Sequence, residues 1–394
     1  MKPEVLEQPA RVETTRSAIT IGLPANRGHN ERRFPLTPEA VRTLVDNYAF
    51  NLFIEQGAGH EIHYPDTAYA HNGATIVPRR EALAADIVVA CAPLSKTDID
   101  TMRRGATLWT TIEPAHFDRD TLEQLNARAI TTISLTSLTT PGGHKPVADI
   151  LDEVDGCAAM SVAAGFLADG VHGKGILLGG VTGIVPCEVI VIGGTTAGVA
   201  AALRAAGLGA TVRLFDNDPC RLRKALTRLD HRAIGSSLHR NVYLKALQWA
   251  DVVINTLRDR EAAPATVDAT EAALLKKGVI VFDFDNHNGG VFPSLRRVDL
   301  SPAVEALPQL TERLCFIHPG RAVPRTSAMA LSNAIVPLLA QFASTQDRTV
   351  NDTARLDPLL SSGIVAIAGK LINREAAAAT GLKWTDPALF ARFS

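Results

Sequence analysis

The sequence lacks paired cysteines with the spacing of a zinc site or a redox motif. It has five cysteines, an odd number, scattered along the chain at Cys91, Cys157, Cys187, Cys220 and Cys315. This pattern predicts reduced thiols, and it argues against a disulfide framework or a metal site.

Long hydrophobic runs are also missing. No stretch offers the about 18 uninterrupted apolar residues that a membrane-spanning helix requires. The longest apolar tract, 189–209, is broken by several glycines and by Arg204. The first 17 residues are polar and charged, which is unlike a secretory signal. We therefore expect a cytoplasmic protein with no membrane partner.

An excess of charge of either sign is absent as well. Forty basic residues stand against 41 acidic ones, for a net charge of −1. This balance gives no electrostatic reason for a nucleic-acid partner or an anionic membrane partner. The length of 394 residues, 46% hydrophobic and 21% charged, suits a globular protein of two domains.

What the sequence does contain is a regular alternation of short Val- and Ile-rich runs with helix-like segments. This alternation is typical of an α/β fold in which helices join buried parallel strands. The first series of expected strands is 17–25, 51–57, 85–93, 106–112 and 129–136. The second series is 187–194, 210–216, 250–257, 278–285 and 313–320.

Helices are expected between and after these strands. One should begin at Thr37-Pro38, with Thr37 as its cap, and others should cover 118–127, 152–168 and 326–343. Because too little chain follows residue 325 to form a third domain, we expect it to return to the first. The predicted domains are 1–150 together with 325–394, and 151–324.

The most informative motif follows the expected strand 187–194. There a buried strand leads into a glycine-rich turn and an alanine-rich helix, an arrangement that binds the pyrophosphate of a dinucleotide at the helix N-terminus. The predicted cofactor-binding residues are Gly193, Gly194, Thr195, Thr196, Ala197 and Gly198. Thr195 stands where the dinucleotide fingerprint has its middle glycine, which leaves less room for the phosphate.

Asp216 ends the next strand, 23 residues after Gly193. A carboxylate at this place accepts hydrogen bonds from ribose hydroxyls and repels a 2′-phosphate, so it favours NAD over NADP. Arg221 and Arg223 lie close enough to weaken that preference. A glycine-rich turn without a nucleotide is the alternative interpretation of the motif.

Several longer motifs resemble one known family. They are NERRFPLTP at 30–38, EQGAG at 55–59, GILLGGV at 175–181, the turn at 193–198, and PGRAVPRTS at 319–327. In this order they resemble alanine dehydrogenases and the N-terminal part of nicotinamide nucleotide transhydrogenases, with saccharopine dehydrogenases as relatives. The resemblance implies two Rossmann-like doubly wound parallel-sheet domains, NAD in the second, and a substrate cleft between them.

The resemblance also assigns site residues, and here the chain departs from the family. Arg33 matches an arginine that binds the substrate carboxylate, although a salt bridge at a surface or between domains is the alternative. The catalytic lysine of the family follows the strand 85–93, where this chain has Ala90-Cys91-Ala92. Cys91 has no base placed beside it and is interpreted as a small buried residue.

The other polar positions around the reacting carbon differ too. Glu113 stands at the place of the family's catalytic histidine, with His116 three residues later. His287 replaces an aspartate near the nicotinamide, and His318 replaces an asparagine there. We predict that these four residues form the acid-base set, with His318 also contacting the cofactor. For each histidine, a structural or solvated role is the alternative.

These features predict an NAD(H)-dependent oxidoreductase that acts on a small amino, imino or keto acid other than alanine. Two alternatives stay open. One is a redox-neutral cyclodeaminase or lyase that recycles bound NAD, and the other is a non-catalytic NAD-binding homologue. A homo-oligomer is expected, and the family that the chain resembles includes hexamers, dimers and monomers in different branches.

Overall fold

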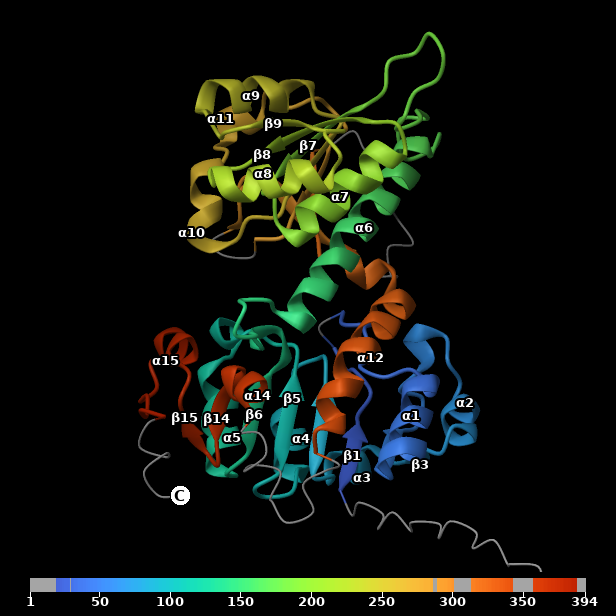
Figure 1. Cartoon of the computed structure of the whole chain (residues 1–394), viewed down its shortest axis with the longest axis vertical. Coiled ribbons are helices and arrows are strands. Elements are labelled where there is room, and N and C mark those ends of the chain that lie inside the picture. The colour runs from blue at the N-terminus through green and yellow to red at the C-terminus, as the bar shows by residue number, and fades with distance from the viewer. Residues whose placement is uncertain (1–18, 29, 286–288, 301–312, 343–356, 388–394) are drawn as a thin grey trace, which may run out of the picture.

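The computed structural model describes residues 19–28, 30–285, 289–300, 313–342 and 357–387. These residues form two lobes stacked along the longest axis of the molecule (Figure 1). Two helices, α6 (Pro146–Ala168) and α12 (Pro324–Ala340), pack against each other where the lobes meet. The chain thus passes between the lobes through packed helices.

The sheet of the first lobe has, among the described residues, the strand order β15-β14-β6-β5-β4-β1-β2-β3. Its strands are β1 (Thr20–Leu23), β2 (Asn51–Glu55), β3 (Thr75–Val77), β4 (Ile87–Ala90), β5 (Thr107–Thr110), β6 (Thr131–Ser134), β14 (Ile364–Ile367) and β15 (Lys370–Leu371). From β6 to β3 every pair is parallel, which confirms the expected α/β fold.

The edge formed by β14 and β15 differs from a purely parallel sheet. β14 runs antiparallel to both β6 and β15. Ala368 and Gly369, both with positive φ, form a tight turn between β14 and β15. So short a connection can join only antiparallel strands, because a parallel pair needs a crossover of a dozen or more residues.

Helices cover both faces of this sheet (Figure 1). They are α1 (Pro38–Tyr48), η1 (His60–Ile62), α2 (Asp66–His71), α3 (Arg79–Leu83), α4 (Lys96–Thr101), η2 (Pro114–His116), α5 (Arg119–Ala127), η3 (Leu135–Ser137), α14 (Pro358–Ser362) and α15 (Arg374–Thr380). The Thr37 side chain accepts from the Ala40 N–H, as the predicted cap requires. Pro38 then occupies the first turn, where a missing N–H costs nothing.

The sheet of the second lobe is parallel throughout its described strands, in the order β12-β13-β11-β10-β7-β8-β9. The strands are β7 (Glu188–Ile192), β8 (Thr211–Phe215), β9 (Ile234–Ser236), β10 (Val252–Asn255), β11 (Ile280–Asp283), β12 (Arg296–Asp299) and β13 (Leu314–Ile317). Around them lie α7 (Thr196–Gly207), α8 (Pro219–Arg228), α9 (Arg240–Trp249), α10 (Asp259–Ala262), η4 (Ala263–Ala265), α11 (Ala269–Ala272) and η6 (Pro319–Ala322). The two Rossmann-like sheets confirm the predicted fold class.

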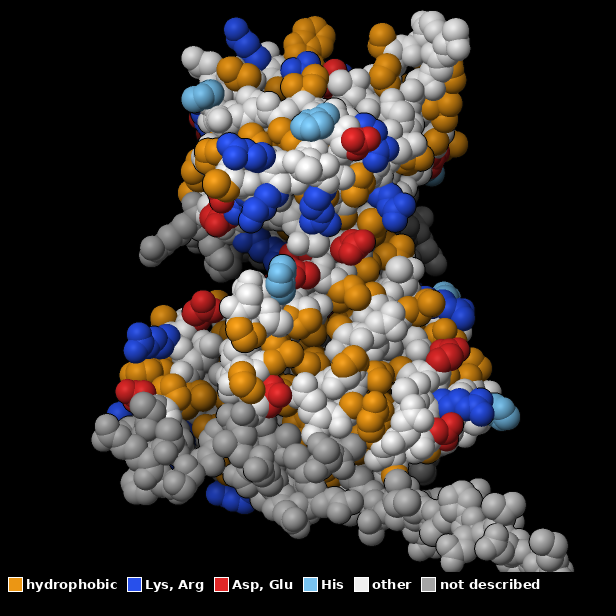
Figure 2. Space-filling view, viewed as in Figure 1, with side chains coloured by type: hydrophobic (Ala, Val, Ile, Leu, Met, Phe, Trp, Pro, Cys, Tyr) orange, Lys and Arg blue, Asp and Glu red, His pale blue; other side chains and the backbone are white. Residues whose placement is uncertain are grey.

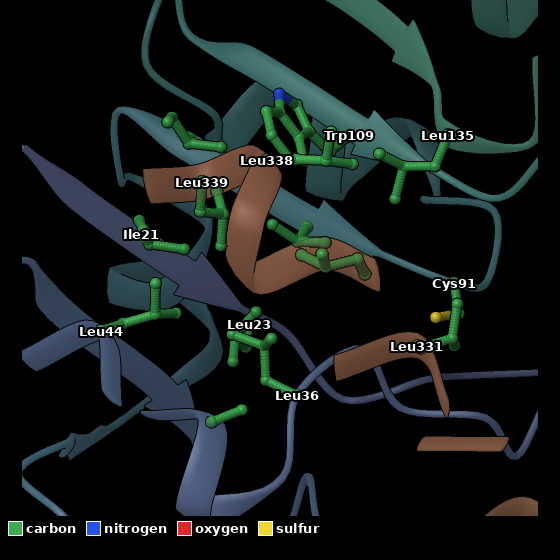
Figure 3. Packing of buried hydrophobic residues seen from close by; sticks show 14 of the residues in the cluster. Ile21, Leu23, Leu36, Leu44, Cys91, Trp109, Leu135, Leu331, Leu338 and Leu339 are labelled. Atoms are coloured by element: carbon green, nitrogen blue, oxygen red, sulfur yellow. The ribbon is translucent and has the colours of Figure 1, made fainter. Parts of the chain in front are cut away.

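The core of the first lobe lies between its sheet and helices α1 and α12. Figure 3 shows Leu331, Leu338 and Leu339 of α12 among side chains from the sheet strands. Cys91, just after β4, belongs to this buried cluster near Leu331. The domain boundaries 1–150 with 325–394, and 151–324, stay a prediction. No helix of the described residues is long and apolar enough to cross a membrane.

Candidate active site

A cavity of about 410 Å³ lies where the two lobes meet. It is lined by Glu31, Arg33, Cys91, Pro93, Thr111, Ile112, Glu113, His116, Thr136, Ala148, Leu151, Asp152, Asp155, Arg258, Phe284, Asp285, His318, Pro319 and Arg321. Most of these residues directly follow strands β4, β5, β6, β10, β11 and β13, and the others come from α6 and from the segment before α1. Ligands of open α/β sheets bind at this carboxyl edge.

Charged side chains of both signs gather at the narrowing between the lobes (Figure 2). The predicted site residues Arg33, Glu113, His116 and His318 all line the one cavity. Residues from both halves of the chain therefore meet there.

Arg33 is held by Glu31, two residues earlier. Its Nε donates to Oε1 of Glu31 at 2.8 Å and its Nη2 donates to Oε2 at 2.6 Å, while the backbone N–H also donates to Oε1. Burial by itself would raise the pKa of Glu31, but the Arg33 guanidinium holds it below its usual range. Both groups are therefore charged. Nη1 of Arg33 has no hydrogen-bond partner among the described residues.

Arg321 lies on the other side of Glu31. Its Nε is 3.4 Å from Oε2 of Glu31, and its Nη1 donates to Asp299 at 2.6 Å. Arg321 follows β13 in the second lobe, whereas Glu31 belongs to the first. The two lobes are therefore joined by an ion pair beside the predicted carboxylate-binding arginine.

Arg258, after β10, reaches the cavity from the second lobe. Its Nη2 donates to Asp152 of α6 at 2.8 Å, and its Nη1 lies 3.8 Å from Glu113. Glu113 in turn lies 3.6 Å from Nδ1 of His116, which is exposed. Glu113 and His116 thus lie side by side in the cavity lining, with Glu113 half-buried and His116 exposed. Burial raises the pKa of Asp152 in spite of Arg258.

Asp155 lies one helical turn after Asp152 on the same face of α6. Its Oδ1 accepts from the Gly320 N–H at 2.7 Å. No Lys or Arg nitrogen of the described residues lies within 4 Å of this carboxylate. Burial raises the pKa of Asp155, against the opposing charge of Arg33.

His318 lies at the end of β13 with a positive φ of 52°. Burial, with the positive charges of Arg321 and Arg33, lowers the pKa of its imidazole to about 3. The ring is therefore neutral at physiological pH, so it can act as a hydrogen-bonding group in the cavity but is a weak proton donor. Its predicted role as an acid or base stays untested.

His287 lies outside the described residues. The segment after it is anchored by Asp283, whose Oδ2 accepts from the Val291 N–H at 2.8 Å. Gly290 has a positive φ of 70°, and a Cβ there would lie 2.2 Å from the same carboxylate. This glycine is thus required by the close approach of the loop to the end of β11.

The position of the family's lysine is filled by a buried thiol. Cys91 is 4% exposed, and burial raises the pKa of its thiol to about 12. A neutral thiol in an apolar cluster is no nucleophile, which agrees with its interpretation as a small packing residue. No lysine is among the described residues that line the cavity.

The predicted dinucleotide turn joins β7 to α7. Gly193 has a φ of 99°, and a Cβ on Gly198 would lie 2.0 Å from the Gly193 carbonyl oxygen, so both positions require glycine. Thr195 caps α7 by accepting from the Gly198 N–H, and its hydroxyl donates to Thr256 at 2.7 Å. At the middle position of the dinucleotide fingerprint, this chain thus has a threonine that caps α7 in place of the usual glycine.

Asp216 follows β8 beside this turn. Its Oδ2 accepts from the Gly194 N–H at 2.7 Å, and Arg221 donates to both carboxylate oxygens, at 2.7 and 2.9 Å. Burial acts to raise the pKa of Asp216, but these donors keep it below the usual range. The charged carboxylate lies where the ribose of NAD is bound in this type of fold. The turn and this acid together fit NAD.

Reasoning from the sequence missed Asp152, Asp155, Arg258 and Arg321. A signal existed for the two aspartates, because they lie three residues apart in a segment that is otherwise rich in alanine and glycine. Acidic residues at that spacing share one face of a helix. No comparable pattern marked the two arginines, whose positions depend on how the lobes meet.

Two Rossmann-like sheets with a charged cavity between them are the architecture of a two-domain, dinucleotide-dependent oxidoreductase. Residues 22–148 match the family model "Alanine dehydrogenase/PNT, N-terminal domain", and residues 159–374 match "Alanine dehydrogenase/PNT, C-terminal domain". The chain belongs to the alanine dehydrogenase/PNT family. It is an oxidoreductase of the alanine dehydrogenase type, and its cofactor is NAD.

Individual relatives agree along nearly the whole chain. The alanine dehydrogenase of Mycolicibacterium smegmatis is 30% identical over 382 residues, covering 94% of this chain and 100% of that protein. That of Staphylococcus saprophyticus is 29% identical, covering 93% and 98%. A solved L-alanine dehydrogenase matches with a TM-score of 0.78 at 26% identity, covering 92% and 99%. A transhydrogenase from Sinorhizobium meliloti, at 17% identity and a TM-score of 0.71, shares the fold and covers 90% and 99%.

Proposed function

We propose that this protein interconverts a small amino acid and its keto acid in the cavity between its lobes, with NAD as hydride acceptor. The observation that carries the proposal is the position of Arg33. The guanidinium is fixed in the cavity by Glu31 and keeps Nη1 available. A carboxylate bound there lies at the carboxyl edge of both sheets, the edge at which the cofactor turn also lies.

The residues have distinct parts in this reaction. When bound, NAD supplies the C4 position that accepts the hydride. Arg33 binds and orients the substrate carboxylate. The N-terminal turn of α7 offers N–H groups to the pyrophosphate, and Asp216 accepts from the ribose.

The relatives named above direct the assay to alanine and pyruvate first. They do not support the expectation from the sequence that the substrate is a different acid. The reason to test other acids is local: Cys91 occupies the family's lysine position, and a thiol with a pKa raised to about 12 cannot replace an ammonium group.

Purified protein should be assayed with NAD and a panel of L-amino acids, and with NADH, ammonium and the matching keto acids. Absorbance of the reduced nicotinamide measures net redox turnover, and mass spectrometry of the products measures any conversion without it. We expect NADH formation with at least one amino acid. Product formation without net NADH would instead favour a redox-neutral enzyme, and NAD binding without any product would favour a non-catalytic homologue.

A homo-oligomer is part of the proposal. The segment 176–185 projects from the second lobe in Figure 1, and it exposes apolar side chains at Leu177, Val181, Ile184 and Val185. Apolar side chains gathered on an arm of this kind commonly lie in a protein interface. Light scattering of the purified protein measures its mass, and a monomer of 42.0 kDa would contradict this expectation.

A further inference from the structure

Oxidation of an amine to a keto acid requires a group that takes up and returns protons beside the reacting carbon. The described residues that line the cavity include no lysine. His318 is held neutral with a pKa of about 3, and His116 is exposed next to Glu113. His287 lies outside the described residues. Among the described residues, the carboxylic acids of the cavity wall are therefore the candidates for the proton-transfer group.

Asp155 has the position that this task requires. It lines the same cavity as Arg33, the residue proposed to bind the substrate carboxylate. The Gly320 N–H fixes its Oδ1 at 2.7 Å, and no described residue donates to Oδ2. A Cβ at position 320 would lie 2.2 Å from Oδ1, so the glycine is what allows this contact. One oxygen is anchored and the other is available in the cavity.

The neighbouring acids on the same wall are already engaged. Asp152 accepts from Arg258 at 2.8 Å, and Glu113 lies 3.8 Å from the same guanidinium. Glu31 is paired with Arg33 through both oxygens. Unlike these three acids, Asp155 has no ion pair within 4 Å among the described residues, and it accepts a hydrogen bond from the Gly320 N–H.

The charges that face Asp155 come from several elements. Arg33, from the segment before α1, and Arg258, after β10, favour its ionised form, whereas Asp152 on its own helix disfavours it. The Gly320 N–H also favours the ionised form, and burial is the largest effect and opposes it. As a result its pKa is above that of an ordinary aspartic acid, which brings it closer to the pH at which a base is most effective.

We propose that Asp155 is the catalytic acid-base residue of this site. This inference rests on the proposed function. The amino acid reacts as the neutral amine, after its ammonium group has lost one proton to solvent. The C–H bonding pair then leaves as hydride to NAD⁺, and the nitrogen lone pair forms the C=N bond of an iminium. The Asp155 carboxylate takes a proton from a water molecule as the oxygen of that water adds to the iminium carbon, and Asp155 then gives this proton to the amine nitrogen. Ammonia leaves with the C–N bonding pair as the carbinol O–H bonding pair forms the C=O bond, and Asp155 takes the O–H proton and passes it to the ammonia. The sum is amino acid, NAD⁺ and water giving keto acid, ammonium, NADH and one H⁺.

The first test is Asp155→Asn in the full-length protein, because an amide keeps the shape and can still accept from Gly320. We expect kcat to fall about 100- to 10,000-fold. KM should change little, and NADH affinity, measured by fluorescence, should stay the same. Glu153→Gln is the matched control, since Glu153 is an exposed acid on the same helix, and it should keep full activity. Asp155→Asn with kcat within threefold of the wild type would overturn the inference.

A second measurement separates chemistry from structure. Asp155→Ala with added sodium formate provides a small carboxylate in the space left by the side chain. We expect formate to restore part of kcat in a concentration-dependent way, with no effect on the wild type or on Glu153→Gln.

If Asp155→Asn does not fold, Asp155→Glu serves in its place, and it should show a shifted pH profile of kcat. A profile identical to that of the wild type would overturn the inference. A wild-type protein without any turnover would overturn the proposed function and this inference together.

Discussion

Arg33 and Glu31 form a fixed two-point contact, with Nε and Nη2 of the arginine 2.8 and 2.6 Å from the two carboxylate oxygens. The pair is separated by one residue in the sequence, so it forms without help from a distant element. It turns the guanidinium towards the cavity and sets the direction from which a substrate carboxylate can approach. This geometry requires the guanidinium group of an arginine, and a positive charge alone would not be enough at this position.

Arg33→Lys should therefore weaken substrate binding while the charge is conserved. An ammonium group cannot keep two bonds to Glu31 and present another donor in the same plane. Loss of one charge-assisted hydrogen bond, about 1.5–3 kcal/mol, corresponds to a rise in KM of roughly 10- to 150-fold. Steady-state kinetics with the best substrate measures this. Arg42→Lys, at an exposed pair with Asp46, is the control. An unchanged KM in Arg33→Lys would remove Arg33 from the binding site.

Asp216→Ala should weaken NAD binding by about 10- to 100-fold, because the ribose loses a charged acceptor. The substitution also leaves the Gly194 N–H and Arg221 without their shared partner. Titration of NADH fluorescence gives the dissociation constant, and a thermal melt shows whether the fold persists. Lys224→Ala, exposed on helix α8, should bind NADH as the wild type does. Equal affinity in the Asp216 variant would contradict the assignment of the ribose site.

Two glycines of helix α7 should respond in opposite ways to alanine. Gly198→Ala places a Cβ 2.0 Å from a backbone oxygen, so we expect a loss of about 1–3 kcal/mol in the free energy of unfolding together with weaker NADH binding. Gly207→Ala meets no atom within 4 Å and should be neutral or stabilising by up to about 1 kcal/mol. Urea unfolding of both variants measures the difference. A Gly198 variant as stable as the Gly207 variant would refute the tight turn.

His318 should make stability depend on pH in a predictable direction. Its folded-state pKa of about 3 lies below the unfolded value of about 6.5. Between these values the unfolded chain binds more protons, so the free energy of unfolding falls as the pH is lowered through that window. His318→Asn should remove this contribution. Melting temperatures of the wild type and the variant, measured from pH 7.5 to 4.5, should therefore diverge in favour of the variant.

His71→Asn serves as the control for that experiment, since His71 is exposed on α2. Its melting temperature should stay parallel to that of the wild type at each pH. If His318→Asn also stays parallel, the imidazole titrates normally in the folded protein and is free to act as an acid near neutrality.

The sequence predicted the strands that carry long apolar runs, such as β7 and β10, because burial on both faces demands such residues. It missed β3, β9, β12 and β15, whose residues are mostly exposed or half-buried and so form no apolar run. It also missed β14, whose four residues are all buried. The sequence of β12, RRVD, is typical of a polar loop, and the segment is a strand because it pairs with β13.

The site residues, like the strands, were predicted only in part from the sequence. Gly193, Gly198 and Asp216 were found because a nucleotide turn is a local motif with fixed spacing. Arg33 came from the family resemblance. Asp155 had only the spacing signal noted above, which did not indicate its contact with Gly320. Arg321 could not be found in this way, since its place depends on its contact with Glu31 of the other lobe. Such a contact depends on how the two lobes meet, which no local pattern encodes.

The packing of helix α6 against α7 bears on the order in which the dinucleotide and the amino acid bind. At Gly156, α6 packs against α7 so closely that a Cβ would lie 2.2 Å from the carbonyl oxygen of Ala197, in the first turn of α7. Asp155 is the preceding residue. We expect that a shift of the α7 terminus when pyrophosphate binds also moves this carboxylate. We expect an ordered mechanism, in which the dinucleotide enters first and the amino acid meets an already adjusted wall.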